Sequence, residues 1–394
     1  MSAPLSTAAA ANSRGMIALQ HGDFAAAAEA FGQAVAADPS SGSLLRNLAS
    51  AHRAAGNDAA ERVALDAALA IDQRDLVGWM RKSELHQRRG ENSAALAAWI
   101  AALTLAEPLK PWSGPLAQSL VAGQAFRQSA TDTIARALEL SDIGDATADD
   151  ERATRRSGAF VEMALGRRSR FPNQCAGLYY PFLPADEFFD RHHFTWFDEL
   201  AASTDAIRAE LVSLLEDAGD SLRPYVQLDK GSPINLWSSL DGSLDWGACF
   251  LWEYGVPNQQ VLKRCPATAK AIAAVPTAPI PGRSPNVFFS ILRPRAHIPP
   301  HTGVTNTRAI VHLPLIVPDG CGFRVGGETR PWVEGEPFAF DDTIEHEAWN
   351  DSDQPRAILI CDVWNPHLSV AEQAAILRYY DVADSTGFSP LRGN

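Results

Sequence analysis

Residues 288–308 read FFSILRPRAHIPPHTGVTNTR, and they decide how the C-terminal half of the chain is interpreted. The stretch begins as an apolar, β-favouring run and ends, after two prolines, in His301 and the residues up to Arg308. Further short β-favouring runs follow, separated by Pro, Gly and Asp: RAIVHLPLIVP, GFRVG, PFAF, HEAWN and RAILICDVW. Strands of this length with turn signals between them predict a sandwich or barrel, and a jelly-roll of about eight strands would accommodate the set.

Three side chains on these runs suit an iron oxygenase. Jelly-roll oxygenases commonly hold Fe(II) with two histidines and one carboxylate, and His301 and His346 lie on separate predicted strands. Arg356 follows His346 by ten residues, and its planar guanidinium can bind a carboxylate through two parallel hydrogen bonds. The acidic residue that normally stands two positions after the first histidine is missing, because that position is Gly303. Taken alone, this departure weakens the oxygenase interpretation.

Five strings between Trp246 and Pro366 occur together: ACFLWEYG, CPATAKAI, FFSILRPRAHIPPHTGVTNTR, HLPLIVPDGCGFRVGGETRPWVEGEPFAFDDTIEHEAWN and RAILICDVWNP. In combination they resemble the aspartyl/asparaginyl β-hydroxylase family. That family is unusual in holding iron with two histidines only, and its first motif carries glycine in place of the acidic residue. Given this resemblance, glycine at position 303 supports the oxygenase interpretation.

The resemblance also implies the residues that hold the metal and the cosubstrate. His301 and His346 would be the ligands of Fe(II). Arg356 and Ser290 would bind the distal carboxylate of 2-oxoglutarate.

Four further positions complete the implied site. His312 would lie near the carboxylate of 2-oxoglutarate that is closest to the metal, and Trp252 would line the same pocket. Arg308 is similar to the family arginine that pairs with the acidic side chain of the substrate, although an ion pair with Asp341, Asp342 or Glu345 would compete. Members with eukaryote-like motifs carry a second arginine two residues later, where this chain has Ile310. Contacts with the cosubstrate or the substrate are expected to differ accordingly.

The implied activity is that of an Fe(II)- and 2-oxoglutarate-dependent dioxygenase, which uses O2 to hydroxylate the β-carbon of an Asp or Asn residue in a peptide or protein. The same chemistry on another substrate, such as a fatty acyl chain or a free amino acid, is one alternative. The other is a non-catalytic adaptor that binds partners through its N-terminal repeats. The complete set of His301, His346 and Arg356 argues against the adaptor, because a decayed site would be expected to lose at least one of them.

The N-terminal third of the chain repeats itself every 34 residues, as Gly22, Gly56 and Gly90 show. In the same register, residues 31, 65 and 99 are large and apolar, and residues 34, 68 and 102 are all alanine. A 34-residue period of paired helices is typical of tetratricopeptide repeats. A generic alanine-rich helical bundle is the alternative, and three coincident registers disfavour it. The repeats would offer a groove for a protein partner, and a structural brace or a dimer contact are the alternatives.

These patterns predict an α+β multidomain protein: repeats over residues 1–110, a helical linker or cap over 111–170, and a jelly-roll (double-stranded β-helix) oxygenase domain over 171–394. One further helix is expected at residues 205–217, and the polar run 142–157 is expected to be a loop or joint.

The net charge, the cysteines and the apolar stretches of the chain limit its possible partners and its cellular compartment. The formal net charge of −13 argues against nucleic acid and against an anionic membrane surface as partners. The five cysteines form no CxxC pair, which fits a reducing compartment. No stretch resembles a signal peptide or a membrane span, so a cytoplasmic location is expected.

Other polar residues near these motifs are expected to have structural roles. His297 should face solvent or support the metal ligands, and His192 and His193 are expected to pack or lie on the surface rather than form a second metal site. Asp341 and Asp342 are expected to end a strand and orient the loop of His346.

Overall fold

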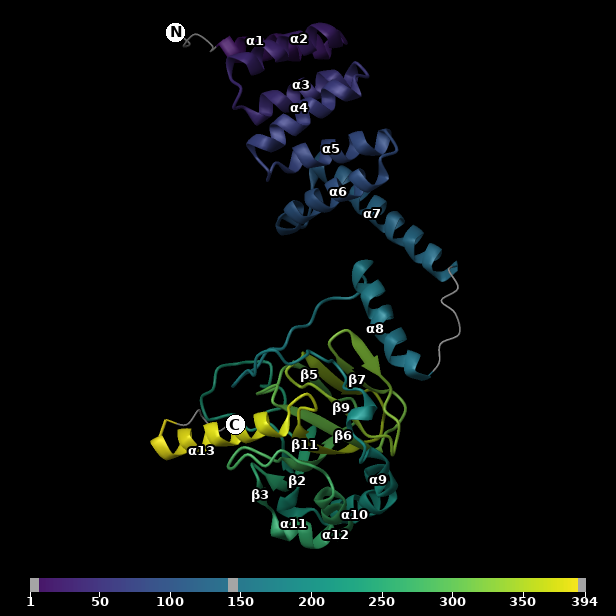
Figure 1. Ribbon diagram of the computed structural model, residues 1–394, viewed down its shortest axis with the longest axis vertical. Helices are drawn as coiled ribbons and strands as arrows, with labels where there is room; N and C mark the ends of the chain where they lie inside the picture. Colours follow the sequence, from purple (N-terminus) through teal and green to yellow (C-terminus); the bar gives the residue numbers. More distant parts are fainter. Residues whose placement is uncertain (1–6, 141–147, 389–394) are drawn as a thin grey trace. The chain divides into compact units, whose positions relative to one another are not determined.

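The computed structural model describes residues 7–140 and 148–388, and it divides into two compact units, residues 1–145 and 146–394. The first unit is all-helical, and the second is built on antiparallel sheets (Figure 1). The helices of the first unit are α1 (Thr7–Gln20), α2 (Phe24–Ala37), α3 (Gly42–Ala54), α4 (Asp58–Ile71), α5 (Leu76–Arg88), α6 (Asn92–Ala106) and α7 (Gly114–Leu140).

The turns inside the three helix pairs share one geometry. Gly22, Gly56 and Gly90 have φ angles of 77°, 71° and 68°, a left-handed conformation that glycine adopts without strain. The residue after each glycine donates its backbone N–H to the carbonyl five residues earlier, at 2.9 Å in all three repeats. The first unit is therefore a tetratricopeptide-like solenoid, as the 34-residue period predicts.

The repeat positions also form the core of this unit. Phe31, Leu65 and Trp99 are at most 1% exposed, and the alanines three residues after each of them are completely buried. The largest of the three, Trp99, packs where α7 presents Gly123, and a Cβ at that glycine would lie 2.3 Å from the indole ring. Small residues thus let the next helix approach a large side chain, which is how a solenoid buries its core.

Replacing Gly123 by alanine is expected to lower the stability of the helical unit by about 1–3 kcal/mol, because the new methyl group overlaps the Trp99 ring. Gly32 is the matched control, since it lies in α2 with no atom within 4 Å of the position of its Cβ. Its replacement by alanine should stabilise the same unit by up to about 1 kcal/mol. Urea unfolding of the full chain, monitored by circular dichroism, measures the stability of both variants. Equal stability of the two variants would contradict this packing.

The second unit begins with a helix where part of a loop was expected. α8 spans Ala148–Ala164, so residues 148–157 are helical and that part of the sequence prediction is wrong. Ala, Glu and Arg are strong helix formers, and their propensity outweighs the polar character of the run. Residues 141–147 lie outside the described part of the chain. The helix expected at 205–217 is confirmed as α10 (Thr204–Glu216).

Two antiparallel sheets form the body of this unit. The seven-stranded sheet has the order β1-β2-β4-β11-β6-β9 with β3 paired to β2, and the four-stranded sheet has the order β5-β10-β7-β8. The larger sheet consists of β1 (Arg223–Pro224), β2 (Trp246–Glu253), β3 (Val256–Pro257), β4 (Val287–Leu292), β6 (Arg308–Ile316), β9 (Phe338–Phe340) and β11 (Arg356–Trp364). The smaller sheet consists of β5 (His297–His301), β7 (Cys321–Val325), β8 (Glu328–Arg330) and β10 (His346–Asn350).

The two faces of the large sheet have different environments. Its outer face packs on α9 (Phe197–Ala202), α10, α11 (Gln259–Arg264) and α12 (Pro266–Ala273), and the apolar residues there form the outer cluster. Its inner face packs on the small sheet, and the residues between the sheets form the inner cluster, with members such as Phe288, Ile358 and Phe323. The sheets thus face one another without closing, as expected for the jelly-roll class. α13 (Val370–Thr386) ends the described fold.

Within the described residues, no helix combines the length and the apolar content that a membrane span requires.

Candidate active site

Two histidines face each other between neighbouring strands of the small sheet. His301 ends β5, His346 begins β10, and the two residues are direct partners in the antiparallel pairing, with ring centroids 4.1 Å apart. Nδ1 of His301 lies 2.8 Å from the carbonyl of Pro299, and Nδ1 of His346 lies 3.0 Å from the carbonyl of Ile344. A carbonyl only accepts, so each Nδ1 carries the proton and each Nε2 keeps its lone pair.

Burial sets the charge of this pair. Desolvation lowers the pKa of His301, and it lowers the pKa of His346 well below the ordinary value, with a further contribution from the neighbouring His301. Both imidazoles are therefore neutral at physiological pH, which is the form that binds a metal ion.

Asp342 takes the space beside this pair that a side chain at position 303 would need. A Cβ on Gly303 would lie 2.0 Å from Oδ2 of Asp342, and the N–H of Gly303 donates to the backbone carbonyl of Asp342 at 2.6 Å. Oδ1 of Asp342 is buried and has no hydrogen-bond partner in the described structure. Desolvation raises the pKa of this carboxyl to about 7, against the opposing effect of Arg308. Glycine at 303 is thus a steric requirement of the fold.

The two aspartates do not orient His346 through a side-chain hydrogen bond, because the acceptor at its Nδ1 is the Ile344 carbonyl. Asp341 instead accepts from Thr343 and Asn173, which ties the loop to an earlier segment.

Arg356 is the largest charged side chain in the interior, and it is only 1% exposed. Its Nη1 has no hydrogen-bond partner, and no carboxylate of the described residues forms an ion pair with it. Desolvation lowers the pKa of its guanidinium to about 10. The group lies 5.2 Å from the ring centroid of Trp332. An unpaired buried guanidinium is costly, so its presence points to an anionic ligand.

Further polar atoms without partners lie beside Arg356. The ring of His312 stacks on Trp332 at 5.5 Å, and both His312 Nδ1 and Trp332 Nε1 are buried without a hydrogen-bond partner among the described residues. Burial lowers the pKa of His312 well below its usual value, and the nearby Arg356 and His346 add to the effect. His312 is therefore neutral. Unpartnered polar atoms of Arg356, His312 and Trp332 thus gather in one buried region.

Ser290 faces the same interior from the centre of β4. It pairs in register with Ile358, two residues beyond Arg356, and its hydroxyl accepts a hydrogen bond of 3.1 Å from the indole of Trp246. Its hydroxyl hydrogen is therefore free to donate to a ligand.

Arg308 also faces the interior, but it already has a partner. Its Nη1 lies 2.5 Å from Oδ2 of Asp362, and both side chains are largely buried. Asp362 lies diagonally across the pairing of β6 with β11, where neighbouring side chains share one face. The competing ion pair expected for Arg308 thus exists, with Asp362 in place of the three carboxylates considered from sequence.

Trp252 is not brought to this site. It packs against the outer cluster, although residues 246, 248 and 250 of the same strand belong to or pack on the inner cluster. The register of β2 shifts between Phe250 and Trp252, and this irregularity turns Trp252 to the helix-covered face. The expectation that Trp252 lines the pocket is therefore corrected.

Two other tryptophans take that place. Trp237 lies 4.8 Å from the ring of His301 and Trp246 lies 6.4 Å from it. Trp237 lies on a loop, so no strand periodicity could have identified it. His297 is exposed and bonds to Glu347, as expected for a histidine outside the site.

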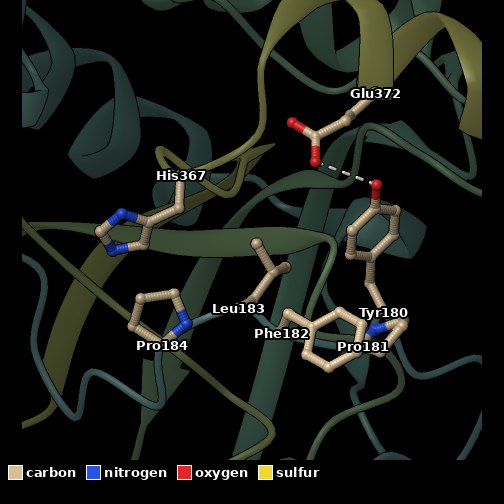
Figure 2. Close-up of a pocket in the computed structure, with 7 residues that line it drawn as sticks. All are labelled: Tyr180, Pro181, Phe182, Leu183, Pro184, His367 and Glu372. Atoms are coloured by element: carbon tan, nitrogen blue, oxygen red, sulfur yellow. Dashed lines mark hydrogen bonds between the residues drawn. The ribbon is translucent and has the colours of Figure 1, made fainter.

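The described residues also line a separate hollow of about 540 Å³, shown in Figure 2. It lies between the segment Tyr180–Pro184 and the start of α13, and the Tyr180 hydroxyl donates to Glu372 across it at 3.1 Å. None of the residues predicted for the catalytic site borders this hollow.

A neutral histidine pair and an unpaired buried arginine, both interacting electrostatically with His312 through His346 and Arg356, define a candidate metal centre with an anion site. Residues 201–366 match the family model described as Aspartyl/Asparaginyl beta-hydroxylase, so this part of the chain is similar to that hydroxylase family.

The curated relatives carry names for different substrates. The human protein named Aspartyl/asparaginyl beta-hydroxylase is 38% identical over 133 residues, which cover 34% of this chain and 17% of that protein. An Ornithine lipid ester-linked acyl 2-hydroxylase from Rhizobium tropici is 36% identical over 186 residues, which cover 46% and 62% of the two chains. The chain thus spans less than two thirds of either relative's length.

Solved structures similar to the helical repeats include one titled "First TPR of Spaghetti (RPAP3) bound to HSP90 peptide SRMEEVD". It has a TM-score of 0.27 and 18% identity, and it covers 30% of this chain and 91% of that one.

Proposed function

We propose that the C-terminal domain is an Fe(II)- and 2-oxoglutarate-dependent dioxygenase that hydroxylates the β-carbon of Asp or Asn residues in a peptide or protein. The observation that carries this proposal is the unpaired guanidinium of Arg356, buried in the same interior as two imidazoles whose Nδ1 atoms face carbonyls, with His312 interacting electrostatically with both Arg356 and His346. A site that binds a metal together with a dicarboxylate accounts for both features.

The donor set fits Fe(II). Imidazole nitrogens suit ferrous iron, and a position not filled by protein leaves room for cosubstrate and dioxygen. In this proposal His301 and His346 would bind the metal, and the buried carboxyl group of Asp342, whose Oδ1 has no hydrogen-bond partner among the described residues, would lie close to it. When bound, iron with 2-oxoglutarate would supply the oxidative chemistry that activates O2.

The pocket around Arg356 fits 2-oxoglutarate. The guanidinium and the Ser290 hydroxyl would bind the distal carboxylate, and this pairing would offset the cost of burying the charge. His312 and Trp332 have buried nitrogens without partners on the same side, and they would bind or orient the remaining oxygens. The surrounding aromatic side chains would exclude bulk water from the reacting atoms.

Arg308 would set the position of the substrate in this reaction. A substrate carboxylate would share its guanidinium with Asp362, so that the ion pair becomes a three-membered network. The solenoid would bring the protein substrate, or a separate protein partner, to the domain through its groove. We place the protein in the cytoplasm, the compartment that its five free cysteines favour.

A second candidate substrate is an uncharged acyl chain. Arg308 is already neutralised by Asp362, and the residue between Arg308 and His312 on the same face is apolar Ile310, which packs on the inner cluster. Because Arg308 is paired and position 310 carries no charge, Arg356 is the one unpaired cation among the described residues of the interior. The name of the Rhizobium relative, an acyl 2-hydroxylase of ornithine lipid, supports this alternative.

Succinate release by the full chain with Fe(II), 2-oxoglutarate and a substrate panel tests both candidates. The panel contains peptides with Asp, Asn or Ala at one position, free aspartate, and an acyl-ester lipid. Turnover with the Asp or Asn peptide, with the Ala peptide inactive, supports the leading proposal. Turnover with the lipid alone supports the second candidate, and the absence of iron binding rejects both.

Replacing His301 and His346 together by alanine is expected to lower iron affinity and turnover by more than about 100-fold. His297→Ala is the matched control, because His297 is exposed and bonds only to Glu347, and it should retain both. Equilibrium dialysis with ferrous iron measures the affinity independently of activity. If the double variant binds iron as tightly as the parent, the metal centre lies elsewhere.

A further inference from the structure

A second histidine cluster lies at a single 3₁₀ turn, Arg191–His193, which is separate from the predicted catalytic pair. The N–H of His193 donates to the carbonyl of Asp190 at 3.1 Å, and this turn brings the side chains at positions 190 and 193 to the same side. Phe189 and Phe194, on either side of the turn, are each 4% exposed. The turn is therefore fixed to the hydrophobic core and holds its polar side chains in place.

The side chains of this turn converge in a way that suits a cation. One potential ligand atom from each of Asp190, His192 and His193 lies within 4.8 Å of the other two. The rings of His192 and His193 have centroids 3.9 Å apart. Nε2 of His193 is buried, and it has no hydrogen-bond partner in the described part of the chain. A buried ring nitrogen without a partner destabilises the fold, so simple packing does not account for it.

A third histidine lies against His193. The ring of His367, which also borders the hollow in Figure 2, lies 5.1 Å from that of His193, and its Nε2 bonds to Asp186 at 2.8 Å. His367 thus has a carboxylate partner that fixes its ring, and the ring in turn supports His193.

The arginines of α8 are the main competitors for the carboxylate. Arg152 and Arg155 lie 2.6 and 3.2 Å from the two oxygens of Asp190. Carboxylates that bind metals are commonly hydrogen-bonded in this way by outer groups, and each oxygen keeps a lone pair. The pairing therefore positions Asp190 without using up its capacity to bind a cation.

We propose that Asp190, His192 and His193 form a second metal site, for a divalent cation of zinc type. Two imidazoles and one carboxylate are a donor set that zinc accepts readily and that magnesium and calcium, which prefer oxygen, do not. Such an ion would fix the conformation of this turn, which packs against His367 just before α13. The site does not depend on the proposed catalytic function.

The test uses the full chain, without any histidine tag, in the His301→Ala/His346→Ala background, which removes the other candidate ligands. Zn²⁺ is titrated against a chromogenic chelator. The background is expected to bind one equivalent of zinc, and adding His192→Ala and His193→Ala should weaken this binding by at least about 100-fold. Adding His297→Ala instead should leave the zinc affinity of the background unchanged. No zinc bound by the background, or equal affinity after the two replacements, would overturn the proposal.

Two additional measurements test whether misfolding or adventitious zinc binding explains the result. Circular dichroism checks that every variant is folded, since His192 is exposed and its replacement should not disturb the core. Zinc X-ray absorption of the background should show two imidazole ligands. A spectrum with no imidazole contribution would indicate an adventitious surface site and reject the assignment.

Discussion

Arg356→Met is expected to abolish 2-oxoglutarate binding and, at the same time, to make the ligand-free protein more stable. Loss of a buried charge that pairs with a carboxylate costs about 3–5 kcal/mol, so the KM for 2-oxoglutarate should rise by more than about 100-fold. The ligand-free protein gains because the guanidinium is 1% exposed and its Nη1 has no partner. An apolar side chain of similar length should fill that space without the cost of desolvating a charge.

The size of the stabilisation follows from the pKa of Arg356. Burial lowers this pKa from the ordinary value of arginine to about 10, which corresponds to about 3 kcal/mol at 1.36 kcal/mol per unit. A base whose pKa falls on folding destabilises the folded state wherever the group is charged in both states, which here means below about pH 10. The deficit of the parent protein relative to the variant is therefore fully present at neutral pH, and it would shrink only as the pH rises above about 10.

Urea unfolding at neutral pH and a titration with 2-oxoglutarate measure the two effects. Arg293→Met is the control, since Arg293 is exposed and directly follows β4. The stability of this variant and its free energy of 2-oxoglutarate binding should both stay within about 0.5 kcal/mol of the parent. Arg356→Lys keeps the charge but loses the planar fork, so its affinity should be intermediate. An Arg356→Met protein that is less stable than the parent, or that binds 2-oxoglutarate normally, would remove the main support for the anion site.

Gly303→Asp should destroy the site rather than create a third metal ligand. The added Cβ would lie 2.0 Å from Oδ2 of Asp342 and 2.2 Å from its Cγ, so the loop cannot keep its present path. The backbone of Gly303 is not left-handed, and the obstacle is therefore lack of space and the approach of two carboxylates. We expect a loss of stability of about 3 kcal/mol or more, with activity falling to background.

A double-mutant cycle tests that explanation. Asp342→Ala removes all three atoms that a Cβ at position 303 would meet first, so Gly303→Asp should be far less damaging in that background. The coupling between the two positions should exceed about 1 kcal/mol in favour of the double variant. Gly158→Asp, at a helical glycine with open space around it, serves as the control. Additive effects, or a stable and active Gly303→Asp protein, would show that Asp342 does not occupy this space.

Local patterns determined the architecture of this protein. The 34-residue period identified the helical pairs because each turn needs a left-handed glycine, which Gly22, Gly56 and Gly90 provide. The β-favouring runs identified the strands of the sheet domain for a similar reason, since their composition and turn signals act within a few residues. The family resemblance is confirmed for the domain, and the roles of His301, His346 and Arg356 remain predictions that the arrangement of these residues supports.

Contacts between segments that are distant in the sequence determined which side chains reach the site and which partners they have. A single irregularity in β2 moved Trp252 to the outer face, and the pairing of β6 with β11 gave Arg308 a partner 54 residues away. Asp342 fills the space at Gly303 only because the loop after β5 meets the loop before β10. The residues near 192 and 367 likewise adjoin only in the folded domain. Side-chain orientation and long-range pairing depend on register and packing, which composition and periodicity do not encode.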